Sequence, residues 1–223
     1  GVRMTAIFLD DILQYQAPSR LGVVATIGTF DGIHKGHQAI FKRVREVSRE
    51  SGLDAVLITF DPHPKTVVSP ERAPRLLTSI EEKRKFIPSF FDGTVVVLKF
   101  TPELMRMTPE EFVRSFLVER IGVKELVVGH DHAIGKGRAG DIGELGRLGA
   151  EYGFDVEVVG PVMLDGSPIS SSRIRKLMTG GQYHEALQLL GHEYAIYGTV
   201  ERGIGLGRKI GYPTANVKYG ASK

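Results

Sequence analysis

This chain alternates short, almost continuous runs of apolar residues with segments of helical length. Runs without a polar face are typical of strands buried on both sides, as in a parallel sheet that helices cover on both faces. The runs that fit this description are residues 23–27, 55–60, 94–98, 125–129 and 155–159. The sequence therefore predicts an α/β fold with a parallel sheet, and in such a fold a ligand lies beyond the carboxyl ends of the strands.

Helices are predicted between these strands, over residues 36–50, 79–90 and 108–119. The third segment opens with Thr108, Pro109 and Glu111. These residues suit an N-cap, the first helical position and the third position of a capping box, so a helix start is expected there.

The pattern changes after about Gly191. Residues 193–201 alternate as in a half-buried antiparallel strand, and a Gly-rich stretch follows. We predict a boundary within residues 181–192, which divides the chain into residues 1–186 and 187–223. The residues after the boundary are too few to bury a core of their own, so the second domain is expected to be incomplete in this sequence.

Composition excludes several classes of protein. The sequence has no cysteine, which excludes disulfide frameworks, thiolate zinc sites and cysteine nucleophiles and fits a reducing compartment. Asp10, Asp11 and Gln14 interrupt the N-terminal apolar residues, so no signal peptide is expected. No membrane span is expected, because apolar residues nowhere form a run of about 18. A cytoplasmic location is therefore expected. A net charge of +3, with basic residues scattered among acidic ones, is not a nucleic-acid footprint and is compatible with an anionic small molecule.

The most informative segment follows the first predicted strand and reads GTFDGIHKGH, from Gly28 to His37. Gly28 and Gly32 let the backbone approach a ligand, and the next helix offers unpaired N–H groups and the positive end of its dipole. His34 and His37 are three residues apart, so they share a helix face from which both can donate to a polyphosphate and stabilise its transition state. A structural or zinc-binding pair is the alternative, although the chain offers no thiolate as a further ligand.

A second motif, from Ile169 to Arg175, reads ISSSRIR and precedes a predicted helix. Serines at a helix start can cap backbone N–H groups and also reach phosphate oxygens, and a guanidinium there would hold a leaving pyrophosphate. Arg173 and Arg175 diverge on the helix surface, so only one of them easily reaches the same phosphate as the serines. The alternative is a plain N-cap with solvated arginines.

In this order, the two motifs resemble those of the nucleotidyltransferase superfamily, in the variant of the bifunctional bacterial riboflavin kinase/FMN adenylyltransferases, or FAD synthetases. The resemblance implies a Rossmann-like domain in which an acceptor phosphate attacks the α-phosphate of ATP in line, without a covalent enzyme intermediate. It implies catalytic roles for His34, His37 and Arg173. The nucleotide-binding residues that it implies are Gly28, Thr29, Phe30, Asp31, Gly36, Ser171 and Ser172.

Residues 59–64, TFDPHP, also resemble the flavin enzymes of this family. The two prolines stiffen a loop at the end of a strand, and Phe60, Pro62 and His63 are the flavin contacts that the resemblance implies. A rigid structural turn is the alternative.

Residues 127–140, VVGHDHAIGKGRAG, match the family in part. Asp131 and Arg138 are kept and are the further nucleotide contacts that the resemblance implies. The chain departs from the family where an aromatic–Arg–Phe run is usual, because His132, Ala133 and Ile134 stand there.

The run from Gly207 to Asn216, GRKIGYPTAN, resembles the riboflavin kinase signature. The resemblance implies the start of a β-barrel kinase domain in which Thr214 and Asn216 help to hold Mg²⁺ and ATP phosphates. On a strand these two residues face the same side, and hard oxygen donors suit Mg²⁺.

The expected function is FMN adenylyl transfer, in which ATP and FMN give FAD and pyrophosphate with Mg²⁺, and riboflavin phosphorylation is expected of the complete protein. The expected partners are the small molecules ATP, FMN and riboflavin, with neither nucleic acid nor membrane. Two rivals stay open at this point. They are a cytidylyltransferase that acts on a polyol phosphate, and a non-catalytic flavin- or nucleotide-binding module.

Overall fold

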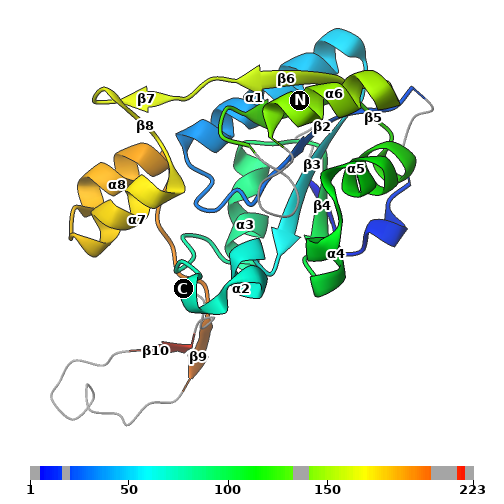
Figure 1. Ribbon diagram of the computed structural model, residues 1–223. Coiled ribbons are helices and arrows are strands. Elements are labelled where there is room, and N and C mark those ends of the chain that lie inside the picture. Colours follow the sequence, from blue (N-terminus) through cyan, green and yellow to red (C-terminus); the bar gives the residue numbers. More distant parts are fainter. Residues whose placement is uncertain (1–5, 17–20, 133–140, 202–214, 219–223) are drawn as a thin grey trace, which may run out of the picture.

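The computed structural model describes residues 6–16, 21–132, 141–201 and 215–218. Its centre is a six-stranded parallel sheet with the order β1-β4-β3-β2-β5-β6 (Figure 1). The strands are β1 (Ile7–Leu9), β2 (Val23–Ile27), β3 (Asp54–Asp61), β4 (Thr94–Lys99), β5 (Val123–Gly129) and β6 (Asp155–Val159). The predicted parallel sheet is confirmed. The edge strand β1 was missed, because three residues with an exposed first position do not form an apolar run.

The chain runs outward from β2 through β3 and β4, and then returns to the other side of β2 to form β5 and β6. The strand order therefore switches between β2 and β5. In doubly wound sheets this switch opens a crevice at the carboxyl ends of the strands. The segment that leaves β2, residues 28–34, lies at that place.

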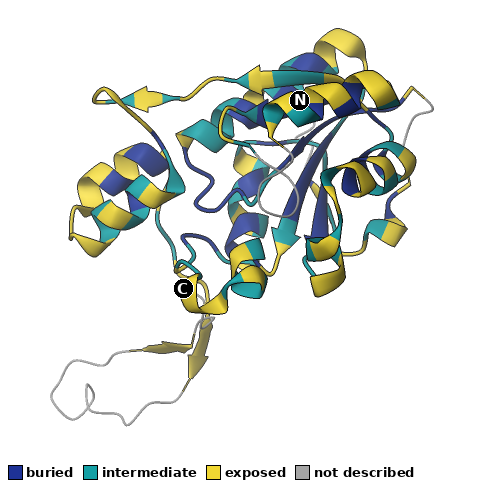
Figure 2. Ribbon diagram, viewed as in Figure 1, coloured by how far each residue is buried: buried dark blue, intermediate teal, exposed yellow. Residues whose placement is uncertain are grey.

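Helices cover both faces of the sheet (Figures 1 and 2). The helices of the described chain are α1 (Lys35–Ser51), α2 (Pro64–Val68), α3 (Ile80–Phe86), α4 (Pro102–Arg106), α5 (Pro109–Phe112), the π-helix η4 (Val113–Ile121), α6 (Ile142–Tyr152), α7 (Ser171–Thr179) and α8 (Tyr183–Leu190), with 3-10 turns η1 (Ile12–Gln14), η2 (Pro70–Arg72) and η3 (Ile87–Ser89). A short hairpin, β7 (Met163–Leu164) and β8 (Ser167–Pro168), precedes α7.

The apolar residues of β2 divide between the two faces. Val23, Ala25 and Ile27 pack with η4 and α6, and Val24 packs with the apolar face of α1 and with the end of α3. This division follows from the alternation of side chains along a strand. A third cluster joins Ile174 of α7 to Leu190 of α8.

Two predicted helices differ in detail from the structure. The segment 79–90 is helical from Ile80 to Phe86 and continues as the 3-10 turn η3, which contains Pro88. Proline has no N–H for the helical hydrogen bond, so the regular helix ends before it. The helix expected over 108–119 has the predicted Thr108–Glu111 capping box and runs on to residue 121 as a π-helix.

The strand predicted over residues 193–201 is wrong for most of its length. Only β9 (Thr199–Glu201) is a strand, and it pairs antiparallel with β10 (Asn216–Lys218). The residues before β9 instead make contacts with the first part of the chain, and these contacts are described below. Helix α8 crosses the predicted division at residue 187, and the domain limits stay a prediction. In the described parts of the chain, no helix combines the length and apolar character that a bilayer crossing requires.

Candidate nucleotide-binding site

The segment from residue 28 to 34, here called the phosphate loop, joins β2 to α1 at the switch in strand order. Phe30 and Ile33 have positive φ angles of 47° and 46°, and Gly32 has one of 90°. Non-glycine residues adopt such angles only where their surroundings hold them. The side chains of Phe30 and Ile33 are buried in the core between the sheet and α1, so burial fixes this conformation.

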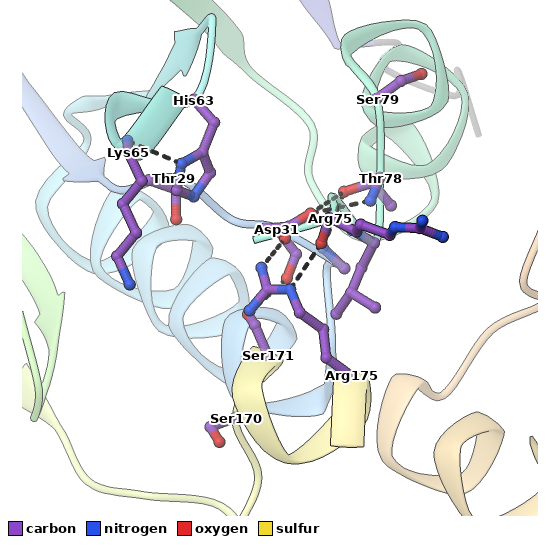
Figure 3. Close-up of polar contacts among 12 residues, drawn as sticks. Thr29, Asp31, His63, Lys65, Arg75, Thr78, Ser79, Ser170, Ser171 and Arg175 are labelled. Atoms are coloured by element: carbon purple, nitrogen blue, oxygen red, sulfur yellow. Dashed lines mark hydrogen bonds and ion pairs between the residues drawn. The ribbon is translucent and has the colours of Figure 1, made fainter. Parts of the chain in front are cut away.

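Asp31 connects the phosphate loop to two other elements (Figure 3). Its side chain is 1% exposed, and Oδ1 accepts hydrogen bonds from the backbone N–H groups of Leu77 and Thr78, each at 2.9 Å. Its other carboxylate oxygen forms an ion pair with Arg175 of α7. A buried carboxylate with this many donors holds the loop, the segment before α3 and the start of α7 in one arrangement.

Lys83 fixes the loop from α3. Its side chain is buried, and Nζ donates to the carbonyl oxygen of Thr29 at 2.6 Å. Thr59 Oγ1 donates to the same oxygen at 3.3 Å. Burial lowers the pKa of Lys83, while the nearby carboxylates of Asp31 and Asp61 oppose that effect.

His34 and His37 lie together at the start of α1. Their rings stack with centroids 3.6 Å apart, and Nδ1 of the N-cap residue His34 accepts from the backbone N–H of His37 at 3.4 Å. Burial lowers the pKa of His34 to about 4, and the pKa of His37 falls well below its usual value because of burial, the neighbouring His34 and Lys83. Both rings are therefore neutral near pH 7.

Neutral imidazoles have one donor and one acceptor each. Because Nδ1 of His34 accepts, its hydrogen is on Nε2. In His37, Nδ1 is buried and has no hydrogen-bond partner among the described residues. Buried polar atoms are normally paired, so an unpaired one next to a helix start is consistent with a place for a ligand.

The second motif lies against the first. Ser171 Oγ donates to the carbonyl oxygen of Asp31 at 2.8 Å, across 140 residues of sequence. A Cβ atom at Gly36 would lie 3.6 Å from the carbonyl oxygen of Ile169. The starts of α1 and α7 thus meet in space, and both present the N–H ends of their backbones near Asp31.

The two arginines of the second motif have different positions. Arg173 donates to the carbonyl oxygens of Leu164, at 3.0 Å, and Ser167, at 2.9 Å, in the β7–β8 hairpin. Arg175 contacts Asp31 and also donates to the carbonyl oxygen of Arg75 at 2.8 Å. The catalytic role of Arg173 stays a prediction, and Arg175 is the arginine that the structure holds beside the phosphate loop. Ser172 is exposed on α7.

Residues 59–64, the TFDPHP segment, lie at the end of β3 and close to Asp31 and Arg175. His63 is buried and caps α2, with Nδ1 accepting from the backbone N–H of Lys65 at 3.1 Å. Burial lowers its pKa to about 4. Phe60 packs edge-on against Phe100, and Pro62 is exposed after a cis peptide bond. Flavin contact by these residues stays a prediction.

The remaining predicted residues are only partly described. Asp131 is exposed just beyond β5, and its charge favours protonation of His34. Asn216 lies in β10 opposite Glu201. Ala133, Ile134, Arg138 and Thr214 lie outside the described residues. In the part of the chain that the structure describes, no three or more His, Asp or Glu side chains gather in a way that could hold a metal ion.

Two site residues were not predicted from the sequence. Lys83 lies on a helix whose pattern gives no sign that this lysine is buried. Arg175 belongs to a motif that was recognised, but the choice between it and Arg173 depends on where Asp31 lies in space.

Comparisons with known proteins identify the family. The FAD synthetase family model matches residues 16–173, and the riboflavin kinase family model matches residues 190–223. A bifunctional riboflavin kinase/FMN adenylyltransferase of Escherichia coli is 38% identical over 202 residues, which is 91% of this chain and 64% of the relative. Relatives with the same name from Pseudomonas fluorescens and Listeria monocytogenes are 39% and 35% identical, over 90% and 96% of this chain and 64% and 68% of their own lengths.

Solved structures support the fold. A crystal structure of a macrolide-efflux protein from Streptococcus pneumoniae superposes with a TM-score of 0.78 and 29% identity, over 96% of this chain and 69% of that one. A pantoate-β-alanine ligase from Francisella tularensis gives a TM-score of 0.52 at 14% identity, over 84% of this chain and 78% of that one, and shows a shared fold alone. The chain spans about 64% of the length of the first curated relatives that it matches. On the family match and these identities, the chain belongs to the FAD synthetase family.

Proposed function

We propose that this chain transfers AMP from ATP to FMN, giving FAD and pyrophosphate. The observation that carries the proposal is the meeting of two helix starts around one buried carboxylate, with His34 and His37 on one side and Ser171 and Arg175 on the other. Helix starts bind phosphate groups, and the three phosphates of a nucleoside triphosphate can reach the starts of both α1 and α7. The names of the relatives supply the acceptor, FMN.

In this reaction an oxygen of the FMN phosphate forms a bond to the α-phosphorus of ATP. The bond from that phosphorus to the oxygen bridging to the β-phosphate breaks, and pyrophosphate leaves. The negative charge that develops is on the bridging oxygen and on the oxygens of the α-phosphate. Groups that donate to these oxygens more strongly in the transition state than in the substrate accelerate the step.

The chain provides donors of two kinds for this task. His34 and His37 are neutral near pH 7, so each can donate one N–H hydrogen bond without the desolvation cost of a buried cation. Arg175 is a cation beside the phosphate loop, where it pairs with Asp31. We propose that the two imidazoles contact the α- and β-phosphates and that Ser171, Ser172 and Arg175 hold the outer phosphates.

Mg²⁺ would be held mainly by phosphate oxygens, because the described residues offer no three-ligand metal group and Mg²⁺ commonly binds through substrate phosphates and waters. Its chemical contribution would be to neutralise charge on the triphosphate. The lack of cysteine supports a cytoplasmic setting. Riboflavin phosphorylation is proposed for the longer protein, since the kinase family model matches only residues 190–223 of this chain.

The test is a turnover assay with ATP and FMN that follows FAD and pyrophosphate. We expect FAD formation by the wild-type chain and a loss of about 100- to 1000-fold in kcat for His37→Ala, the size of effect seen when one oxyanion donor is removed. His184→Ala is the matched control, because His184 is exposed on α8 and bonds only to Gln188 among the contacts described. Near-normal turnover by His37→Ala at an unchanged Tm would contradict the proposed role.

Two further arms separate the rival functions. CTP with glycerol 3-phosphate tests the cytidylyltransferase, and product formation there but not with ATP and FMN would overturn the proposal. A non-catalytic module would bind ATP or FMN but release no pyrophosphate with either pair of substrates.

A further inference from the structure

His192 joins the segment after α8 to the phosphate loop. It lies beyond the FAD synthetase match and within the riboflavin kinase match, which begins at residue 190. Its Nε2 is 2.8 Å from the carbonyl oxygen of Gly32, and its Nδ1 is 2.7 Å from the carbonyl oxygen of Glu193. Its ring packs against Phe86 of α3 with the centroids 4.5 Å apart.

The contact with Gly32 has a defined direction. A carbonyl oxygen only accepts hydrogen bonds, so His192 Nε2 is the donor and the Gly32 carbonyl oxygen is the acceptor. Two charged residues lie along the same segment: the side chain of Lys35 lies against Gly191, and Glu82 on α3 accepts from the backbone N–H of Tyr197.

The hydrogen bond from His192 fixes the direction of the Gly32 carbonyl group. A peptide carbonyl turned toward bound phosphates would repel them, while a carbonyl turned away leaves the N–H groups and the helix dipole to face the anion. The Gly32 peptide is held on both sides, since its N–H donates to Thr78 Oγ1 at 2.8 Å and its carbonyl accepts from His192.

Two further bonds tie the same segment to the site. Gln38 Nε2 donates at 2.8 Å to both Leu190 and Ile33 carbonyl oxygens, which links the end of α8 to the phosphate loop. The backbone N–H of Tyr197 donates to Glu82 Oε1 at 3.1 Å, next to Lys83, which binds the loop at Thr29. The segment 190–197 thus contacts the loop directly and again through α3.

We propose that His192 is a positioning residue for the triphosphate, supplied by the segment that leads into the kinase part of the chain. It acts through the Gly32 peptide rather than on the reacting atoms. The inference rests on the proposed function. It assigns a role in ATP binding to a residue that lies outside the FAD synthetase match.

The experiment compares His192→Ala, His192→Arg and the control His184→Ala in steady-state FAD synthesis and in calorimetric titration with ATP and Mg²⁺. We expect His192→Ala to raise the KM and the Kd for ATP about five- to tenfold, as for loss of one hydrogen bond, with the KM for FMN unchanged. His192→Arg should restore ATP affinity to within about twofold, since a guanidinium can donate to both carbonyl oxygens. The control should match the wild type.

A merely structural role for His192 gives a different result. It would lower the Tm and the active fraction, so kcat would fall while the KM for ATP stayed unchanged and His192→Arg brought no rescue. That outcome overturns the inference, as does unchanged ATP affinity in His192→Ala. The calorimetric titration measures ATP binding without turnover. A chain that binds ATP but makes no FAD would therefore contradict the proposed function, while the effect of His192→Ala on ATP affinity could still be measured. A wild-type chain that binds no ATP would overturn both.

Discussion

Replacement of Asp31 by asparagine removes one charge from the centre of the site and keeps its shape. The amide oxygen of the introduced side chain can still accept from the N–H groups of Leu77 and Thr78. Its amide nitrogen, however, would meet the guanidinium of Arg175, so a donor would face a donor. Arg175 would lose its ion-pair partner while its side chain stays only 20% exposed.

The expected cost follows from these contacts. Loss of one partner of a buried ion pair costs about 3–5 kcal/mol, and a hydrogen bond to a charged group contributes about 1.5–3 kcal/mol. Because Arg175 is partly exposed, water can solvate it in the variant, so the cost falls below the roughly 3–5 kcal/mol of a fully buried pair and within the upper part of the range for a hydrogen bond to a charged group. We expect Asp31→Asn to lower the free energy of unfolding by about 2–3 kcal/mol, which for a chain of this size is a drop in Tm of roughly 4–12 °C.

Urea unfolding at pH 7 measures this change, with Asp155→Asn as the control because that carboxylate is exposed at the start of β6. A double-mutant cycle with Arg175→Met separates the ion pair from the backbone contacts. If the ion pair carries the effect, Asp31→Asn costs much less stability in the Arg175→Met background. Equal costs in the two backgrounds, or a cost no larger than that of the control, would refute the reasoning.

Two other results are expected. Lys83→Met removes the buried donor to the loop and should lower kcat/KM for ATP by about tenfold or more, whereas Lys85→Met on the exposed side of the same helix should not; equal effects in a turnover assay would contradict this. The lowered pKa values of His34 and His63 mean that between pH 6.5 and about 4 the unfolded chain binds more protons than the folded one, so stability should fall as the pH falls through this range. Urea midpoints measured across that range test it, and the dependence should flatten in His34→Asn.

The secondary structure could be predicted where it depends on residues that are close together in the sequence. The strands from β2 to β6 follow from apolar runs, and the start of α5 follows from the spacing of Thr108 and Glu111, because these patterns lie within a few residues of one another. The phosphate loop could likewise be placed between a strand and a helix. The meeting of the two motifs was expected from the resemblance alone, since no local pattern encodes a contact between Asp31 and Ser171.

The sequence does not predict contacts that depend on the completed fold. Nothing in the pattern of α3 marks Lys83 as buried, because its burial results from the loop that packs over it. The strand predicted over residues 193–201 was wrong for residues 193–198, because alternation was taken as a sign of pairing with another strand. In the structure Tyr197 instead donates to Glu82, and His192, just before this range, contacts the phosphate loop; neither partner is near in sequence.

The backbone of the phosphate loop explains why so many distant elements contact it. Phe30 and Ile33 are in the left-handed region, which costs an L-residue roughly 1–2 kcal/mol each. The carbonyl oxygens of the loop accept from Lys83, Ser171 and His192, which belong to three different parts of the chain. These contacts offset the cost of the strained backbone, so the conformation of the loop depends on α3, α7 and the segment after α8 together. Because His192 lies within the riboflavin kinase match, a residue of that match helps to hold a loop of the FAD synthetase match.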